Sequence, residues 1–387
     1  MLLGVYYNGV ELHRNEKMVY ARFLSPHRVI STCSAAGGLR DDLSFLYNHQ
    51  SCEPTGHNRT VHRLISREPK EYRRLICELH NLPDESCATL GTAANMRYAA
   101  VREASFRELT VVAVCTGGVE SNAGRAGDPA TVYEWSGAYE RVSPAEPVAH
   151  GTINTMLFIN HELTEGAMVR AVMTATEAKT AALQELVVGS RYSKGLATGT
   201  GTDQIGIASR LQSGAILHGA GKHCVLGELI GRTVHDAIRE TLKLQNALTA
   251  DGCRSTVYHL RRFGVTRDSL LHDVTAQMNA AWAELLRKNF TGIERDPLVV
   301  AAVAALVHVR DEIAWGILPE GCEPELRATY GAQIAAAVSG NYRRLPEYME
   351  MLTDRENAID EDFTHLIARA IATGFCEKWE EPDPGNA

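Results

Sequence analysis

Small polar residues crowd the start of a strongly apolar segment in the middle of the chain. In the stretch HGTINTMLFIN (residues 150–160), the run Ile153–Ile159 is typical of a buried strand, and Thr152 and Asn154 lie at its beginning. A hydroxyl next to a glycine at such a position either belongs to an ordinary strand entry or faces a ligand and acts as a nucleophile. Taken singly, a threonine of this kind is more often structural than catalytic.

Three further corners of the chain combine glycines with hydroxyl, amide or charged side chains. Glycines let backbone N–H groups approach a ligand closely and form nests that stabilise anions. A hydroxyl beside such donors suits acyl transfer, in which the nucleophile and the oxyanion hole lie about 3 Å from one carbonyl group. The repetition of this pattern in one block therefore favours a shared acyl-transfer site. The residues concerned are Thr116, Asn122 and Asp128 on the first corner, Thr198, Thr200, Gly201, Thr202 and Asp203 on the second, and Lys222 and His223 on the third.

The composition excludes several classes of protein. The 387 residues are 45% hydrophobic and 22% charged, as in soluble globular proteins, and a net charge of −8 offers no basic field for nucleic acid. The first residues do not resemble a signal peptide, and the longest apolar run (residues 297–309) is too short to span a bilayer. The nine cysteines include no C-x-x-C spacing, which is typical of reduced thiols. We therefore expect a cytoplasmic protein that binds neither nucleic acid nor a membrane.

Two motifs that would indicate a nucleotide or a metal are incomplete. Around HGAGKH, the Walker pattern would need a glycine in place of Ile216 and a serine or threonine in place of His223. The sequence HELTE differs from the zincin motif H-E-x-x-H, because Glu165 stands where the second histidine ligand belongs. We therefore expect neither a phosphate-binding loop nor a zinc site.

The elements that position these residues follow one pattern as far as residue 248, in which an apolar strand, a glycine-rich corner and a helix succeed one another. Strands are expected at 109–115 and 153–159, and a long helix at 164–186, with Thr164 as its N-cap and an alanine-rich face for packing on a sheet. A second helix follows HGAGKH. Nearer the N-terminus, residues 10–23 and 27–38 are expected to form the strands of a hairpin, and residues 68–82 a helix.

From residue 249 onward the pattern is that of amphipathic helices, in the stretches 266–290, 299–318 and 361–379. We therefore predict two domains, 1–248 and 249–387. The predicted fold class is α/β (α+β), with one central sheet or two stacked sheets flanked by helices and followed by an all-α domain. The role of the helical domain stays open between an oligomerisation module of a homo-oligomer, a lid, and a direct part in substrate binding.

Several stretches of the first domain resemble one known family. In order along the chain, TVVAVCTGGVESNAGRAGD, GTINTMLFIN, TEAKTAALQEL, ATGTGTD and GAGKH are similar to the adenosylcobinamide amidohydrolase (CbiZ) family, as are STCSAAGG and LGTAANM upstream. The resemblance covers residues 25–248. It implies an enzyme of corrinoid salvage that hydrolyses the amide between the aminopropanol arm of adenosylcobinamide and a corrin propionate, giving adenosylcobyric acid. It implies no separate cofactor, because the cobalt arrives within the corrinoid substrate.

A second resemblance concerns the mechanism. The sequence GTINTMLFINHEL is similar to the nucleophile strand of the β-aminopeptidases and ornithine acetyltransferases, in which a serine or threonine after a processed bond begins a strand. This resemblance implies that Thr152 is the nucleophile, that GTGTD lies near it, and that the core is an α/β/β/α sandwich. The chain departs from those families at Asn160 and His161, which replace the usual Asp-Ala pair.

Two mechanisms are compatible with these residues. In the first, cleavage of the Gly151–Thr152 bond frees the Thr152 amine, which acts as the base for its own hydroxyl. In the second, the chain stays intact and a carboxylate or histidine activates Thr152 or a water molecule. The bases considered for the second mechanism are Asp203, Glu177, His150 and His223.

The predicted site combines these arguments. Glu177 and Lys179 are two residues apart on a helix and cannot face one pocket together, so we favour Glu177 for the site. The asparagines and the N–H groups of the glycine-threonine corner would polarise the substrate carbonyl. The predicted catalytic residues are Thr152, Asp203 and Glu177, and the predicted substrate-binding residues are Asn122, Asn154, Thr200, Gly201, Thr202, Lys222 and His223.

Two other functions stay open. A protein that keeps the predicted corrinoid-binding site but lacks amidase activity would bind or deliver corrinoids. An acyltransferase of the ornithine type would pass the acyl group to an amine instead of water.

Overall fold

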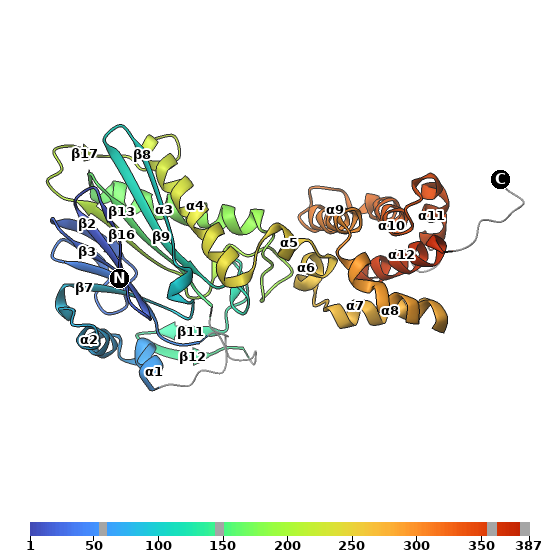
Figure 1. Cartoon of the computed structure of the whole chain (residues 1–387), viewed down its shortest axis with the longest axis horizontal. Coiled ribbons are helices and arrows are strands. Elements are labelled where there is room, and N and C mark those ends of the chain that lie inside the picture. The colour runs from blue at the N-terminus through green and yellow to red at the C-terminus, as the bar shows by residue number, and fades with distance from the viewer. Residues whose placement is uncertain (54–59, 144–150, 354–361, 380–387) are drawn as a thin grey trace, which may run out of the picture. The chain divides into compact units, whose positions relative to one another are not determined.

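The computed structural model describes residues 1–53, 60–143, 151–353 and 362–379. The chain divides into two compact units, Met1–Leu248 and Thr249–Ala387 (Figure 1). His150, one of the bases considered above, lies outside the described residues.

A six-stranded sheet carries the segment from which the sequence argument started. Strand β13 (Ile153–Ile159) lies inside this sheet, parallel to β16 (Gln204–Arg210) and antiparallel to β9 (Leu109–Gly117). In this register, Asn154 pairs with Gln204 on one side and with Thr116 on the other. The corners before β13, before β16 and after β9 therefore meet at one end of the sheet. The sheet order is β5 (Gly38–Arg40), β4 (His27–Ser31), β16, β13, β9 and β8 (Ala100–Phe106).

A second sheet packs face to face on the first. Its strand order is β1 (Leu2–Tyr6), β2 (Val10–Arg14), β3 (Met18–Phe23), β6 (Phe45–Gln50) and β7 (Cys87–Thr92). Alternate residues of each strand point to the same face, and one apolar cluster joins the two inner faces. Its members include Leu12, Ala21, Leu46 and Leu90 from the second sheet and Val112, Val114, Met156, Phe158 and Ala208 from the first.

Helices cover the two outer faces of this pair of sheets. Helices α3 (Glu165–Glu185) and α4 (Val225–Asn246) pack on the six-stranded sheet, and α1 (Thr60–Arg67) and α2 (Pro69–Leu79) on the other (Figure 1). The predicted alanine face of α3 is buried, and Thr164 accepts a hydrogen bond from the Ala167 N–H as the N-cap. Strand β13 is covered on both faces, so all of its residues are buried, and they are apolar except for Asn154 and Thr155 near its start. The predicted α/β/β/α sandwich is confirmed.

The expected N-terminal hairpin is wrong in one respect. Residues 10–23 form a hairpin by themselves, since β2 pairs with β3. Strand β4, expected to pair with them, belongs to the six-stranded sheet, where it lies between β5 and β16. Pro26 separates β3 from β4 and has no N–H to continue a ladder, so the chain crosses to the other sheet at this point.

Short strands complete the first unit. They pair as β10 (Ala123–Gly124) with β15 (Gly199–Thr200), β11 (Val132–Trp135) with β12 (Ala138–Arg141), and β14 (Glu162–Leu163) with β17 (Ile216–Leu217). The first of these pairs ties the corner of Asn122 to the corner of Thr200.

The second unit is helical, as predicted. The stretch 266–290 contains two helices, because the Asn279 side chain accepts a hydrogen bond from the Trp282 N–H and starts a new one. Among the described helices of the whole chain, none is both long and apolar enough to cross a bilayer. The helices are α5 (Ala250–Cys253), α6 (Thr256–Leu260), α7 (Arg267–Thr275), α8 (Ala280–Glu294), α9 (Pro297–Ala314), α10 (Glu323–Ser339), α11 (Leu345–Leu352) and α12 (Phe363–Lys378).

A buried histidine makes the stability of the first unit dependent on pH. The His27 imidazole lies 2.7 Å from the Ser25 carbonyl oxygen and 3.1 Å from the Tyr7 hydroxyl, and it stacks on Phe23. Burial lowers the pKa of His27 from 6.5 to about 4; the Ser25 carbonyl opposes this effect, and the charge of Arg210 adds to it. The unfolded chain therefore takes up this proton at a higher pH than the folded chain does.

We predict that the stabilising contribution of neutral His27 is complete above pH 6.5 and is lost as the pH falls toward 4. Between pH 6.5 and pH 4, the free energy of unfolding should fall in both proteins. The fall should be smaller in the His27→Gln variant than in the wild type, by on the order of 2 kcal/mol. Hydrogen exchange of the β4 amides, corrected for the intrinsic effect of pH on exchange, measures the difference. An equal pH dependence in both proteins would contradict the prediction.

Candidate active site

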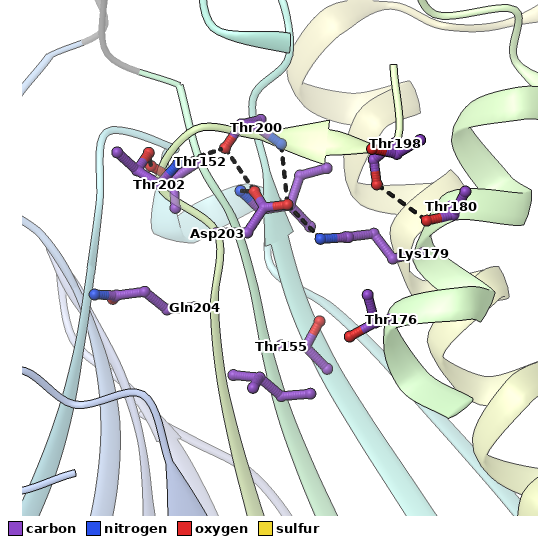
Figure 2. A network of polar contacts seen from close by, with 12 residues as sticks. Thr152, Thr155, Thr176, Lys179, Thr180, Thr198, Thr200, Thr202, Asp203 and Gln204 are labelled. Atoms are coloured by element: carbon purple, nitrogen blue, oxygen red, sulfur yellow. Dashed lines mark hydrogen bonds and ion pairs between the residues drawn. The ribbon is translucent and has the colours of Figure 1, made fainter. Parts of the chain in front are cut away.

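The Asp203 carboxylate joins three segments at the end of the six-stranded sheet. Its Oδ1 accepts hydrogen bonds from the Ile153 N–H at 2.9 Å and from the Thr200 hydroxyl at 2.6 Å. Its Oδ2 accepts one from the Thr200 N–H at 3.0 Å and another from the Lys179 ammonium on α3. Figure 2 shows Asp203 between Thr200 and Lys179. A carboxylate accepts about four hydrogen bonds, so these donors occupy it fully. Its role is therefore to hold the segments of Ile153, Thr200 and Lys179 in place.

The Thr152 hydroxyl lies in a chain of polar contacts next to this carboxylate. Thr152 is 6% exposed, and its Oγ1 lies 2.6 Å from the Thr202 Oγ1. The Thr202 hydroxyl donates to the Gly151 carbonyl oxygen at 3.0 Å. Since a hydroxyl has a single proton, Thr202 must accept the proton of Thr152 in this arrangement. The Thr152 hydroxyl is thus oriented, and the peptide bond before it is polarised.

Asn122 supplies a second donor to the same carbonyl. Its Nδ2 lies 2.8 Å from the Gly151 oxygen, and its Oδ1 accepts a hydrogen bond of 2.5 Å from the Tyr192 hydroxyl. Because the Gly151 carbonyl can only accept, the NH2 end of the buried amide must face it, and the phenol donates to the remaining amide oxygen. Burial, and secondarily the charge of Asp128, raises the pKa of Tyr192 and keeps it a neutral donor. Tyr192 was not among the site residues predicted from the sequence.

Two glycines of the cluster are required for close approach. A Cβ atom on Gly199 would overlap the Asp203 carboxylate and lie 2.8 Å from the Lys179 Nζ. A Cβ atom on Gly151 would lie 2.9 Å from the Gly118 carbonyl oxygen. The glycines therefore bring the backbone against the polar groups, as the sequence argument expected of these corners.

Lys179, and not Glu177, reaches this cluster. Positions two apart on an α-helix point to nearly opposite sides, and the Glu177 carboxylate pairs instead with the Lys222 ammonium at 2.8 Å. Both of these side chains are at least half exposed, and His223 is exposed beside Lys222. The structure thus gathers Thr152, Thr200, Gly201, Thr202, Asp203 and Asn122 at one place and leaves Glu177, Lys222 and His223 elsewhere.

One signal in the sequence could have identified Lys179. This residue lies in the alanine-rich, sheet-facing stripe of α3, where a lysine is out of place unless a carboxylate pairs with it. The side chains of Lys179 and Asp203 are only 15% and 14% exposed. Lys179, as a charged residue in an apolar stripe, was therefore a better indicator of the site than Glu177, which lies on the polar face of the helix.

The burial and the hydrogen bonds of Asn154 do not support the substrate-binding role predicted for it. The residue is fully buried, and its Nδ2 donates to the Asn48 Oδ1 at 2.9 Å and to the Gly91 carbonyl oxygen at 3.0 Å. Its Oδ1 accepts a hydrogen bond from the Gln204 N–H at 3.2 Å. The amide thus links the two sheets below the site. In the described part of the chain, no three His, Cys, Asp or Glu residues are grouped as metal ligands would be.

We predict that Gly199→Ala weakens the ion pair between Lys179 and Asp203, because the added methyl group displaces both partners. The overlap should cost about 1–3 kcal/mol, which lowers the melting temperature of the first unit in calorimetry. Gly201→Ala is the matched control, since its Cβ would meet the Asn122 Oδ1 at an ordinary 3.5 Å. Equal melting temperatures for the two variants would show that the close approach at Gly199 has no energetic importance.

Comparison with known proteins identifies the family of the first unit. The family model of the adenosylcobinamide amidohydrolases, CbiZ, matches residues 4–250. An uncharacterized protein of Methanocaldococcus jannaschii is 37% identical over 186 residues, which cover 46% of this chain and 71% of that protein. The resemblance stated from the sequence motifs is confirmed, and most of the helical unit lies outside the match. The chain belongs to the adenosylcobinamide amidohydrolase family.

Proposed function

We propose that the protein hydrolyses the amide that joins the aminopropanol arm of adenosylcobinamide to a propionate of the corrin ring. The products are adenosylcobyric acid and aminopropanol. Membership of the family supports the substrate class. The observation that carries the chemistry is the oriented Thr152 hydroxyl beside two donors, Asn122 Nδ2 and Thr202 Oγ1, that converge on one carbonyl oxygen. This is the arrangement that acyl transfer requires.

In the proposed reaction, the Thr152 Oγ attacks the amide carbon of the substrate, and the hydroxyl proton passes to a base. The amide oxygen becomes an oxyanion between Asn122 and Thr202. The C–N bond then breaks, and aminopropanol leaves with the proton. Water hydrolyses the resulting ester, which releases adenosylcobyric acid and restores Thr152. Asp203 and Lys179 act as positioning residues, because they hold the first residues of β13.

The same donors support cleavage of the chain before Thr152 as the first step. In the intact chain both donors are occupied by the Gly151 carbonyl oxygen, so a substrate can use them only after that group leaves. Attack of the Thr152 Oγ on the Gly151 carbon would give an ester and free the Thr152 amine. Water would then release residues 1–151 with a new carboxylate. The free amine would serve as the base for the Thr152 hydroxyl.

The alternative mechanism, with an intact chain, needs another base. Asp203 is poorly suited to it, because four donors already occupy its carboxylate. Glu177 pairs with Lys222 and does not join the Thr152 cluster. These contacts favour the mechanism in which the chain is cleaved.

We predict that the purified active protein gives two masses, for residues 1–151 and 152–387, and that Thr152→Ala gives one. Intact-protein mass spectrometry makes the measurement. A single mass of the whole chain together with full amidase activity would rule out cleavage before Thr152 and leave the intact-chain mechanism.

We also predict that Thr152→Ala lowers the rate of aminopropanol release from adenosylcobinamide by about 10³-fold or more, because it removes the nucleophile. Thr152→Ser should retain activity. Thr176→Ala is the control, since among the described residues the Thr176 hydroxyl makes one hydrogen bond, to the Val172 carbonyl oxygen of its own helix. Chromatography with mass detection quantifies both products.

Other outcomes of this assay identify the other two functions. Adenosylcobinamide that stays bound and unchanged in the presence of the wild type would indicate a corrinoid carrier. Transfer of the acyl group to an added amine, in preference to water, would indicate an acyltransferase.

A further inference from the structure

The helical unit contains a cavity of about 570 Å³. It lies among α8, α9, α10 and α12, which Figure 1 labels in the orange and red part of the chain. The volume is in the range of pockets that bind small molecules. The cavity lies outside the part of the chain that matches the family model, and nothing in the proposed amidase reaction uses it. Its lining residues include Leu285, Gly292, Ile293, Asp296, Phe375 and Trp379.

The walls of the cavity are suited to a flat apolar group. Phe375 and Ile293 form buried parts of the wall, whereas Trp379 is 56% exposed. An exposed tryptophan next to a cavity is a frequent contact for a ligand ring. Gly292 lines the cavity, and a Cβ atom built on it would meet nothing within 4 Å. A larger side chain at position 292 would therefore have room to enter the cavity, whose walls are largely apolar.

The charges around the cavity favour an anionic substituent. The Asp296 Oδ1 accepts hydrogen bonds from the Leu298 N–H at 2.9 Å and the Val299 N–H at 3.1 Å, so its charge is partly offset by the N-terminus of α9. Lys378 also lines the cavity, with its Nζ 5.7 Å from the centre of the Trp379 ring, and it forms no ion pair within the described residues. In the part of the chain that the structure describes, no carboxylate therefore pairs with the ammonium beside the aromatic wall.

We propose that this cavity is a second binding site, which takes a small aromatic molecule carrying a carboxylate. The ring would lie against Phe375 and Trp379, and the carboxylate would pair with the Lys378 ammonium. The site shares no residue with the proposed amidase site, and its test measures binding and not catalysis.

The test uses 2-naphthoate and its neutral analogue 2-naphthamide as probes in isothermal titration calorimetry with the full-length protein. The wild type should bind one 2-naphthoate per chain. Gly292→Leu places a side chain in the cavity and should weaken binding of both probes at least about tenfold. Gly166→Leu is the matched control, because Gly166 is another exposed helical glycine whose Cβ would meet nothing within 4 Å, and it lies in α3 of the first unit.

A second variant isolates the role of charge. Lys378→Gln should weaken binding of 2-naphthoate about five- to tenfold and leave binding of 2-naphthamide unchanged, because only the carboxylate uses the ammonium group. Equal binding of 2-naphthoate to wild type and Gly292→Leu would overturn the proposed site. Absence of binding to the wild type would overturn the ligand class, as would an equal effect of Lys378→Gln on both probes.

Discussion

The pairing of the buried Asp203 carboxylate with Lys179 and backbone or hydroxyl donors organises the end of the sheet where Thr152 lies. Asp203 and Lys179 are mostly buried, and charges in such places are tolerated only when they are paired and hydrogen-bonded. The ion pair and three further donors meet this requirement, and in doing so they tie β13, the glycine-threonine corner and α3 together. Removal of one partner of such a pair costs about 3–5 kcal/mol, because the other charge is left uncompensated. The position of the Thr152 hydroxyl therefore depends on an interaction that does not itself touch the hydroxyl.

The topology explains why these segments meet. Strands β13 and β16 are parallel neighbours, so their first residues lie at the same end of the sheet. Strand β9 is antiparallel to β13, so its last residues lie at this end as well. Three corners far apart in the sequence are thereby brought within hydrogen-bonding distance. Below them, Asn154 and Asn48 join the two sheets and leave the amide groups of the core satisfied.

The two units of the chain differ in the kind of candidate site that they contain. In the first, functional groups lie on corners between strands and helices, where loops carry side chains on a rigid scaffold. In the second, the helices bury an apolar cluster, and a cavity lined in part by Gly292 lies among four of them. The hydrogen bonds around Thr152 support the proposed amidase site. The apolar cavity and the Lys378 ammonium support the proposed second site.

The sequence by itself determined the α/β character of the first unit, the helical second unit and Thr152 as a hydroxyl at a strand entry, because periodicity and glycine corners are local properties. The family and the α/β/β/α core were implied by the resemblance of its motifs to known families. It could not determine which residues of one helix share the site. Lys179 and Tyr192 belong to the cluster, although the sequence favoured Glu177 over Lys179 and did not single out Tyr192. Glu177, Lys222 and Asn154 were predicted for the site, but their side chains make their contacts elsewhere. The rotation of a helix on a sheet and the register of strands are fixed by packing between distant segments, and only the tertiary structure contains that information.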